Sequence, residues 1–428
     1  MGVQSPACGA RGRAFESRRG RLPGADQPLL FIYPLRKTGM NPARPLPTHT
    51  SRRDIDLLIL GAGPAGLSTA LHLLQIDSSW ADRMLVLEKS VHPRPKLCAG
   101  GVTRFGLQIL RDLGFQLPLP LPQARIDEAQ LHYVSDVVRV RGTPQLVVFH
   151  RPELDAYLAQ HARLRGVNIH QSEPAQSLRV DQRGVSVAST LGEYRACVVV
   201  GADGTLGIAR RSLRQPQGHA RIARLLEVWQ PVDSQTRQSA EHIAFFDFTP
   251  VKEHLQGYYW KFPSSVEGQP VFNCGVYDAR MTTGHPRAEL PRLLLHWLAE
   301  SCLPTENLKP AGHPIHWFSP RARFAGPRLV LVGDAAGVDP LFGEGIAPAL
   351  GYGQVAAQVI QRAFSSGDFS FRDYPQRLFT SAVGRYLLLR WAVAWWGYRL
   401  CERPSFMRPL WALGVLLARI WPTPLPLW

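Results

Sequence analysis

The sequence predicts an α/β fold in which a largely parallel sheet is interrupted by a domain on a mixed β-sheet and followed by a helical C-terminal region. Short apolar strands run into glycine-rich turns at three distant places, about 56–66, 198–204 and 329–345. Strands that recur between helical segments are typical of a parallel sheet. Aromatic residues at every second position from 258 to 262 indicate a strand with one apolar face. Residues 386–400 are rich in Leu, Trp and Tyr without proline, which favours a helix.

The composition is that of a globular protein. Its 428 residues are 45% hydrophobic and 19% charged, whereas a disordered chain combines low hydrophobicity with high charge. The length suffices for about two or three domains. Six cysteines include no Cys-x-x-Cys pair and no Cys/His cluster, so we expect no metal site and a reducing, cytoplasmic compartment. No apolar run reaches the roughly 18 residues that a membrane-spanning helix needs.

The positive charge is concentrated at the N-terminus. The formal charge is +16, from 49 basic and 33 acidic residues, and only six of the basic residues are lysines. Residues 1–53 are rich in Arg, Pro and Gly, and we expect them to form a disordered leader. Translation from Met40 would remove most of this leader; an Arg-rich transit peptide is the alternative. No nucleic-acid-binding module is recognisable, so we expect no nucleic-acid partner.

A glycine-rich turn follows the first strand, which covers 56–60. The turn consists of Gly61, Ala62, Gly63, Pro64, Ala65 and Gly66. In a strand–turn–helix unit of this pattern the first glycine permits the tight turn, the second lets the backbone approach a pyrophosphate, and the third lets the helix pack closely. The next strand ends in Glu88, at the spacing at which a carboxylate binds a ribose diol. The segment predicts a Rossmann-like site for FAD or NAD and, because an acid stands at 88, not for NADP.

Two distant turns carry further candidate cofactor-binding residues. They are Asp203, Gly204, Asp334, Gly343, Gly345 and Ile346. A carboxylate just after a strand can bind a sugar hydroxyl, and a glycine-rich helix start directs N–H groups and a positive dipole at a ligand. For a flavin, that ligand edge becomes negative on reduction.

Together the three turns resemble the FAD-binding fold of p-hydroxybenzoate hydroxylase-type enzymes, over about residues 54–365. The resemblance implies FAD as cofactor. Arg151 begins an Arg-x-x-x-Asp segment similar to the one whose arginine lies near the cofactor phosphates in that family, and we expect Arg94 and Lys96 beside the pyrophosphate too. The chain departs from the family at Gly207, where serine is common, and keeps Arg210.

Three segments are similar to signatures of the geranylgeranyl reductase family. Residues 94–101 resemble its Cys-Gly-Gly-Gly loop, with Ala99 in place of one glycine; 257–263 match Tyr-x-Trp-x-Phe-Pro; and 340–346 match Pro-x-x-Gly-Glu-Gly-Ile. The resemblance implies an FAD-dependent oxidoreductase that reduces carbon–carbon double bonds of a geranylgeranyl-type chain by hydride transfer. It implies an isoprenoid lipid or prenyl diphosphate as substrate. No second Gly-x-Gly-x-x-Gly appears, so we expect the reductant to dock transiently or to be a protein electron donor. The resemblance implies NADPH or reduced ferredoxin as that donor.

The alternating aromatic residues are the candidate substrate-binding residues. Tyr258, Trp260 and Phe262 share a strand face and would form an apolar wall suited to a prenyl chain; alternatively, this face is simply the core of the second domain. Cys98 and Tyr258 are the catalytic candidates, for positioning the substrate or delivering a proton. A small buried apolar residue is the alternative interpretation of Cys98.

Other functions fit the same fold. An FAD-dependent monooxygenase or halogenase is one alternative, although halogenases carry Trp-x-Trp-x-Ile-Pro where this chain has Tyr-x-Trp-x-Phe-Pro. A carotenoid cyclase-type isomerase that uses reduced FAD without net redox change is the second. The mass of the product distinguishes the reductase from the cyclase-type isomerase, because reduction adds two hydrogens per bond and cyclisation adds none.

We expect a discontinuous FAD-binding domain, a substrate domain and a helical end. Their ranges are 54–125, 150–215 and 321–365 for the first, 126–149 and 216–320 for the second, and 366–428 for the third.

Six of the eleven tryptophans lie in the last 45 residues. Tryptophan and arginine beside leucine suit a helix at a membrane surface, so we expect residues 385–428 to make the protein a peripheral membrane protein. Alternatively, these tryptophans cover the catalytic domain or a partner subunit. The oligomeric state is left open.

Overall fold

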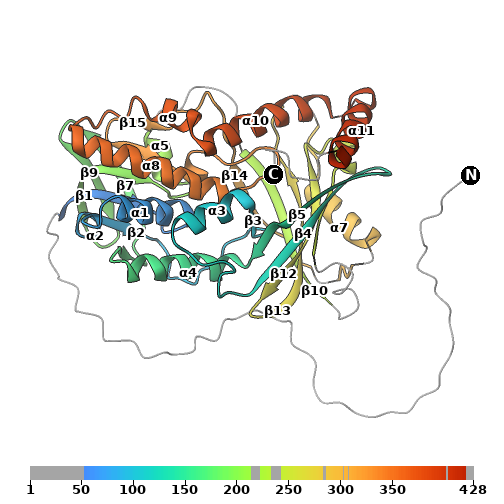
Figure 1. Cartoon of the computed structure of the whole chain (residues 1–428), viewed down its shortest axis with the longest axis horizontal. Helices are drawn as coiled ribbons and strands as arrows, with labels where there is room; N and C mark the ends of the chain where they lie inside the picture. Colours follow the sequence, from blue (N-terminus) through green and yellow to red (C-terminus); the bar gives the residue numbers. More distant parts are fainter. Residues whose placement is uncertain are drawn as a thin grey trace, which may run out of the picture. The chain divides into compact units, whose positions relative to one another are not determined.

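The computed structural model describes residues 53–420 apart from 214–221, 233–241, 283–285, 302, 307 and 402 (Figure 1). The expected leader, except for its last residue, and the final eight residues with Trp421 and Trp428 lie outside the described residues. The elements form two sheets with helices around them, and a helical C-terminal region follows. The predicted α/β fold class is therefore confirmed.

The first sheet is parallel at its centre, in the order β15–β16–β9–β1–β2–β6. Its strands are β1 (Arg53–Leu60), β2 (Met84–Leu87), β6 (Asn168–His170), β9 (Glu193–Gly201), β15 (Ala325–Gly326) and β16 (Leu329–Leu331), and the hairpin β7 (Ala175–Asp181) and β8 (Gly184–Ser189) extends from β9. Residues 57–60 of β1 are at most 1% exposed, which is the continuous apolar pattern of a parallel strand covered on both faces.

Two helices cross closely beside this sheet, α1 (Pro64–Ile76) and α8 (Ile346–Ser366). A Cβ atom built on Gly353 would lie 2.6 Å from Cβ of Ser68, so the crossing requires glycine on α8. The Ser68 hydroxyl donates to the carbonyl of Leu350 at 2.7 Å and fixes the two helices together. The other helical segments of this part are α2 (Trp80–Arg83), α3 (Arg104–Asp112), α4 (Arg151–Leu164), α5 (Ile208–Ser212), η2 (Gly333–Ala335) and α9 (Tyr374–Thr380).

The second sheet is mixed, in the order β14–β10–β13–β12–β11–β4–β5–β3. Its strands are β3 (Gly101–Thr103), β4 (Gln123–Tyr133), β5 (Asp136–Phe149), β10 (Ile222–Pro231), β11 (Ile243–Asp247), β12 (Gly257–Val266), β13 (Gln269–Asp278) and β14 (Ala311–His316). Only the β11–β4 pair in this sheet is parallel. The chain enters this sheet twice, through β3–β5 and through β10–β14, so both sheets are assembled from distant segments.

The two faces of this second sheet lie in different cores, because residues alternate along each strand. On the face that we call the back face, Tyr259 and Val276 pack with Leu294 and Trp297 of α7 (Leu290–Glu300). On the opposite face, which we call the front face, Tyr258, Trp260 and Phe262 pack with other aromatic residues and with the loop that precedes α8. The short helix η1 (Thr249–Glu253) connects β11 to β12.

The C-terminal region consists of α10 (Ala382–Leu400) and α11 (Pro404–Ile420) (Figure 1). Ser381 caps α10 by accepting a hydrogen bond from the N–H of Gly384 at 3.1 Å. Helix α11 packs against β5, and Trp411 contacts the rings of Tyr133 and Phe248 at centroid distances of 5.3 and 5.4 Å. No helix in the described part of the chain is both long and apolar enough to cross a bilayer.

Candidate functional site

The first glycine-rich turn has the geometry that its sequence predicts. Gly61 has a φ of +107°, and a Cβ atom there would lie 2.4 Å from the carbonyl oxygen of Ala202. A Cβ on Gly66 would lie 2.0 Å from the carbonyl oxygen of Gly61. A Cβ on Gly63 would face a guanidinium nitrogen of Arg94 at 3.5 Å. Pro64 begins α1, where the absence of an N–H group costs nothing.

Glu88 lies directly beneath this turn and is 3% exposed. Its Oε2 atom accepts the N–H of Ala62 at 2.9 Å, and its Oε1 atom accepts the N–H of Ser90 at 3.1 Å. The carboxylate also pairs with Nε of Arg94 at 3.4 Å. The structure therefore brings the acid at the end of β2 to the glycine turn, although the two are separated by more than 20 residues.

Two arginines meet at one buried carboxylate beside the turn. Asp155, on α4, accepts two hydrogen bonds from Arg151, at 2.9 and 3.1 Å, and pairs with Arg94 at 3.3 Å. Burial lowers the pKa of Arg151, but Asp155 and the nearby Cys98 outweigh this effect and the net pKa is raised. Arg151 is thus a fixed cation, and Arg94 presents a second guanidinium to any anion that approaches the backbone at Gly63.

The third turn packs directly on the first. Gly333 has a φ of +59°, and a Cβ there would lie 2.7 Å from Cβ of Ala65. Asp334 follows, and its carboxylate lies 3.9 Å from Nζ of Lys96. A Cβ built on Gly345, which precedes Ile346 at the start of α8, would lie 3.6 Å from the same carboxylate. Asp334, Lys96 and the N-terminus of α8 therefore converge on one place.

In the middle turn, Asp203 makes a contact within the protein that its expected cofactor-binding role did not predict. Asp203 accepts the N–H of Ala209 at 3.0 Å and so caps the short helix α5, and burial raises the pKa of Asp203. A Cβ on Gly207 would lie 2.0 Å from Cγ of Asp203. The departure from the family pattern at this position thus has a physical reason, because a serine would collide with the capping carboxylate. Gly204, with a φ of +81°, turns the chain before α5.

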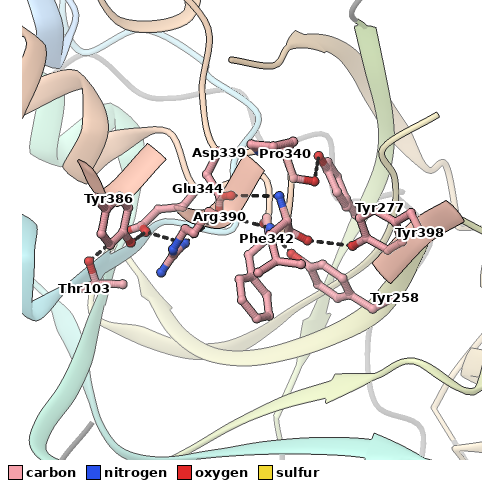
Figure 2. Close-up of polar contacts among 11 residues, drawn as sticks. Thr103, Tyr258, Tyr277, Asp339, Pro340, Phe342, Glu344, Tyr386, Arg390 and Tyr398 are labelled. Atoms are coloured by element: carbon pink, nitrogen blue, oxygen red, sulfur yellow. Dashed lines mark hydrogen bonds and ion pairs between the residues drawn. The ribbon is translucent and has the colours of Figure 1, made fainter. Parts of the chain in front are cut away.

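A network of tyrosines and one arginine holds the loop before α8 (Figure 2). Three consecutive carbonyls of this loop each accept a hydroxyl: Pro340 from Tyr277 at 3.0 Å, Leu341 from Tyr398 at 2.6 Å, and Phe342 from Tyr258. The donors come from β13, α10 and β12. Burial raises the pKa of Tyr258 and Tyr277 well above the ordinary value, so both hydroxyls stay protonated.

Arg390, on α10 like Tyr398, reaches the same loop and is only 1% exposed. It pairs with Asp339 at 2.5 Å and with Glu344 at 3.1 Å (Figure 2). Glu344 also accepts hydroxyl hydrogen bonds from Tyr386 and, at 2.7 Å, from Thr103. Burial lowers the pKa of Arg390, but Tyr386 and the two carboxylates reverse this effect and raise it. Helix α10 is therefore part of the support of the glycine-rich loop that contains Gly343.

The aromatic residues of β12 lie where this loop meets the second sheet. Tyr258, Trp260 and Phe262 are each at most 6% exposed. The ring of Phe246 contacts those of Phe262 and Tyr258 at centroid distances of 5.0 and 5.4 Å. Phe262 lies 3.8 Å from a Cβ built on Gly101, so this aromatic wall reaches the loop that contains Cys98.

Cys98 contacts a carboxyl group that the sequence pattern did not single out. Its backbone N–H donates to Oε1 of Glu227 at 3.2 Å, and its sulfur accepts the N–H of Gly100 at 3.4 Å. Glu227 lies on β10 and is 1% exposed, and burial raises its pKa to about 7. Nearby on β14, burial lowers the pKa of His313 to about 4, and Lys96 adds to the effect, so the imidazole is neutral at pH 7.

Sequence reasoning thus missed Glu227 and most of the loop network. A glutamate inside an apolar strand was one available signal. Tyr386, Arg390 and Tyr398 were another, because their spacings of four and eight residues place them on one face of a largely apolar helix. No group of three or more His, Cys, Asp or Glu side chains that could hold a metal ion occurs within the described ranges.

The residues fit an FAD cofactor. The turn at 61–66 has glycines where a Cβ would strike backbone, two arginines adjoin it, and a carboxylate stands at the start of α8. These are the elements that bind a pyrophosphate, a sugar alcohol and the electron-accepting edge of a flavin.

Comparisons with known proteins agree with this geometry. The FAD binding domain family matches residues 54–349. The digeranylgeranylglycerophospholipid reductase 1 of Methanothermobacter thermautotrophicus is 28% identical over 352 residues, which cover 74% of this chain and 80% of that protein.

Solved structures share the fold. A geranylgeranyl bacteriochlorophyll reductase-like protein from Thermoplasma acidophilum has a TM-score of 0.70 at 21% identity, covering 88% of this chain and 93% of the other. The halogenase PltM, solved with phloroglucinol and FAD, has a TM-score of 0.60 at 16% identity, covering 80% and 76%. The chain belongs to the FAD binding domain family and is an FAD-dependent oxidoreductase, and its sequence is similar to that of a digeranylgeranylglycerophospholipid reductase.

Proposed function

We propose that the protein reduces carbon–carbon double bonds of a geranylgeranyl-type isoprenoid chain. The observation that carries this proposal is the position of the aromatic wall. Tyr258, Trp260 and Phe262 join the Cys98 loop at one end and the glycine-rich loop before α8 at the other. An apolar wall between two cofactor-facing loops suits a long hydrocarbon substrate and offers little to a polar one.

When bound, FAD in its reduced state supplies a hydride. We propose that the residues that hold it are Gly61, Gly63, Pro64, Ala65, Gly66, Glu88, Arg94, Lys96, Arg151, Asp203, Gly204, Asp334, Gly343, Gly345 and Ile346. Of these, Asp203 uses one carboxylate oxygen to cap α5, so its part is to shape the middle turn. The N-terminus of α8, at Gly345 and Ile346, would stabilise the negative charge that the flavin gains on reduction.

The aromatic wall orients the alkene and excludes water. An isolated alkene has no oxygen for the protein to polarise, so positioning must supply much of the rate. Because the Tyr258 hydroxyl donates to the carbonyl of Phe342, we assign Tyr258 to the wall and to the support of the loop. Cys98 then stands as the polar group of the loop that faces the reacting carbons.

The substrate class that we propose is an isoprenoid lipid or a prenyl diphosphate, with NADPH or reduced ferredoxin as electron donor. The name of the 28% identical methanogen reductase supports a prenylated phospholipid.

We further propose that α10 and α11 rest on a membrane surface that holds such a lipid. Their exposed large apolar residues are Leu389, Trp396, Leu410, Leu413 and Leu416, and the exposed arginines on and between the two helices are Arg385, Arg399, Arg403 and Arg408. Exposed leucine and tryptophan among arginines suit an anionic interface. The double substitution Trp396→Glu and Leu413→Glu should weaken cosedimentation with phosphatidylglycerol vesicles. Leu295→Glu, at an exposed leucine of α7, is the matched control, and equal sedimentation of both variants would contradict the membrane role.

The test of the proposed reaction is anaerobic. The FAD-loaded protein is reduced with dithionite, geranylgeranyl diphosphate or a geranylgeranylated glycerolipid is added, and flavin absorbance and product mass are followed. We expect reoxidation of the flavin and a gain of two hydrogens per reduced bond. An isomer of unchanged mass would favour the cyclase-type alternative, and an oxygenated product formed only in air would favour the monooxygenase.

A further inference from the structure

We propose that Glu227 is the acid that supplies the proton for alkene reduction, a role that rests on the proposed function. Reduction of a double bond requires a hydride on one carbon and a proton on the other. The proton donor has to reach the aromatic wall, and the observations below place the Glu227 carboxyl there.

The register of the second sheet puts Glu227 on the same face as the wall. In the antiparallel ladders, Glu227 is opposite Gly275, and Gly275 is opposite Trp260. Directly opposed residues point to the same face of a sheet. The Trp260 ring extends over Gly275 toward β10, since a Cβ on Gly275 would lie 2.2 Å from the ring and 2.4 Å from the carbonyl oxygen of Leu226. Within β10, β12 and β13, Glu227 is the one carboxylic acid on this face.

The surroundings of Glu227 are unusual for a structural carboxylate. One oxygen accepts the N–H of Cys98, whereas Oε2 is buried and has no hydrogen-bond partner among the described residues. The amide nitrogen of Asn273, whose oxygen accepts the indole N–H of Trp260 at 2.6 Å, also lacks a partner at full hydrogen-bond geometry in the described part of the chain, although this side chain is close enough to Glu227 to lower its pKa. An ionised carboxylate with an open oxygen would be costly at such a place, whereas a neutral carboxyl has an O–H group to donate.

The pKa of Glu227 agrees with this geometry. Burial raises it to about 7, against the opposing effects of the Cys98 N–H, Asn273, Lys96 and Arg151. The acid is therefore substantially protonated at neutral pH, yet cations and an N–H group stand ready to stabilise the carboxylate that remains after transfer.

Glu227 also lines a pocket, together with Leu97, Val228, Trp229, Leu308, Lys309 and Ala311. We infer that the carboxyl regains its proton from this side, because the residue borders both the apolar wall and a pocket that contains a lysine.

The step balances as follows. The alkene takes up a hydride on one carbon, for which the reduced flavin of the proposed function is the two-electron donor. The second carbon uses the former π-electron pair to form a C–H bond with the proton of Glu227, whose O–H bond breaks. The products are a saturated carbon–carbon bond, oxidised flavin and the Glu227 carboxylate, which then takes a proton from water.

The experiment compares Glu227→Gln with Glu173→Gln. The first change keeps an oxygen that can accept the Cys98 N–H but removes the acid. The second removes another buried carboxyl, in the segment between β6 and β7, which accepts hydrogen bonds from the hydroxyls of Ser189 and Tyr194. Infrared spectra of both proteins, recorded from pH 5 to 9, report the protonated-carboxyl band. Anaerobic single turnovers with geranylgeranyl diphosphate report product formation over the same pH range.

We expect the wild-type protein and Glu173→Gln to show a carboxyl band that disappears near pH 7, and Glu227→Gln to lack it. We expect product formation by Glu227→Gln to be at least about 100-fold slower, without the wild-type decline above pH 7. Product formed at the wild-type rate and pH dependence by Glu227→Gln, or no band assignable to Glu227, would overturn the role of Glu227 alone. Failure of the wild-type protein to form product would overturn the proposed function itself.

Discussion

The two faces of the second sheet are built from the same strands but are satisfied in different ways. On the back face, Tyr259 stacks on Trp297 of α7 at a centroid distance of 4.9 Å and donates its hydroxyl to the carbonyl of Leu293 at 3.0 Å. On the front face, Tyr258 donates to a loop of the FAD-binding part, while Glu227 and Asn273 keep buried atoms without partners among the described residues.

We attribute the difference to the roles of the two faces, namely stability for the back face and chemistry for the front face. A face that serves only packing is apolar and has its polar atoms bonded, because an unsatisfied buried atom costs free energy. A face that serves a reaction keeps polar atoms open for a substrate and accepts that cost. Substitutions on the back face should therefore change the free energy of unfolding alone, and substitutions on the front face should also change the binding or reaction of cofactor and substrate.

The largest effect on stability is expected at the centre of the back face. Trp297→Ala removes an indole that packs against Tyr259 and should cost about 3–5 kcal/mol in the free energy of unfolding. Urea unfolding measures this loss. The folded fraction should retain the FAD absorbance spectrum of the wild-type protein, and a changed spectrum with little loss of stability would contradict the assignment of this face.

Whereas Trp297→Ala should lower the free energy of unfolding, Glu227→Gln should raise it relative to the wild type as the pH rises. Because the folded-state pKa is raised from 4.5 to about 7, the unfolded state loses its proton first as the pH rises, and stability falls between these two values. The glutamine variant escapes this loss. Its unfolding free energy relative to wild type should rise by up to about 3 kcal/mol from pH 4 to pH 8. A pH-independent difference between the two proteins would contradict the raised pKa.

The adjacent tyrosines form a matched pair. Tyr258→Phe and Tyr259→Phe each remove one hydroxyl that donates to a backbone carbonyl, so each should cost about 1 kcal/mol of stability. Only Tyr258→Phe should alter FAD affinity, because only its partner lies in the loop before α8. FAD titration by fluorescence quenching checks this difference, and equal affinities would show that Tyr258 does not support the cofactor loop.

The smallest perturbation is chemical modification of two thiols. Cys274 on the back face is fully buried, and burial raises its pKa to about 12, whereas Cys98 is partly exposed. Iodoacetamide at pH 8 should label Cys98 in the native protein and leave Cys274 unlabelled, as judged by peptide mass spectrometry. Comparable labelling of Cys98 and Cys274 would mean that the thiol on the back face is as accessible to the reagent as Cys98, which would contradict the difference between the two faces.

Much of the fold was predictable because its signals are local. The turn at 61–66 and the alternation at 258–262 encode their own geometry in adjacent residues, and the structure places both as expected. The cofactor could be predicted for the same reason, since glycine spacing and the acid at 88 identify a dinucleotide site.

The remainder depends on contacts between distant segments. Arg390 has a role only because α10 returns to Asp339 and Glu344. The tryptophans of the C-terminal helices divide between the two roles considered from sequence: Trp411 is buried against Tyr133, and Trp396 is 61% exposed. Glu227 became visible only through the register that places it opposite Gly275 and Trp260.

Photolabelling tests the central claim most directly, namely that the front face of the second sheet binds the hydrocarbon. A geranylgeranyl diphosphate analogue with a photoreactive group on the chain is irradiated with the FAD-loaded protein, and the labelled peptides are identified by mass spectrometry. We predict labels on Trp260, Phe262 and the 98–101 loop, which unlabelled geranylgeranyl diphosphate suppresses. Labels confined to α7 or α11, or labels that excess substrate does not suppress, would contradict the account.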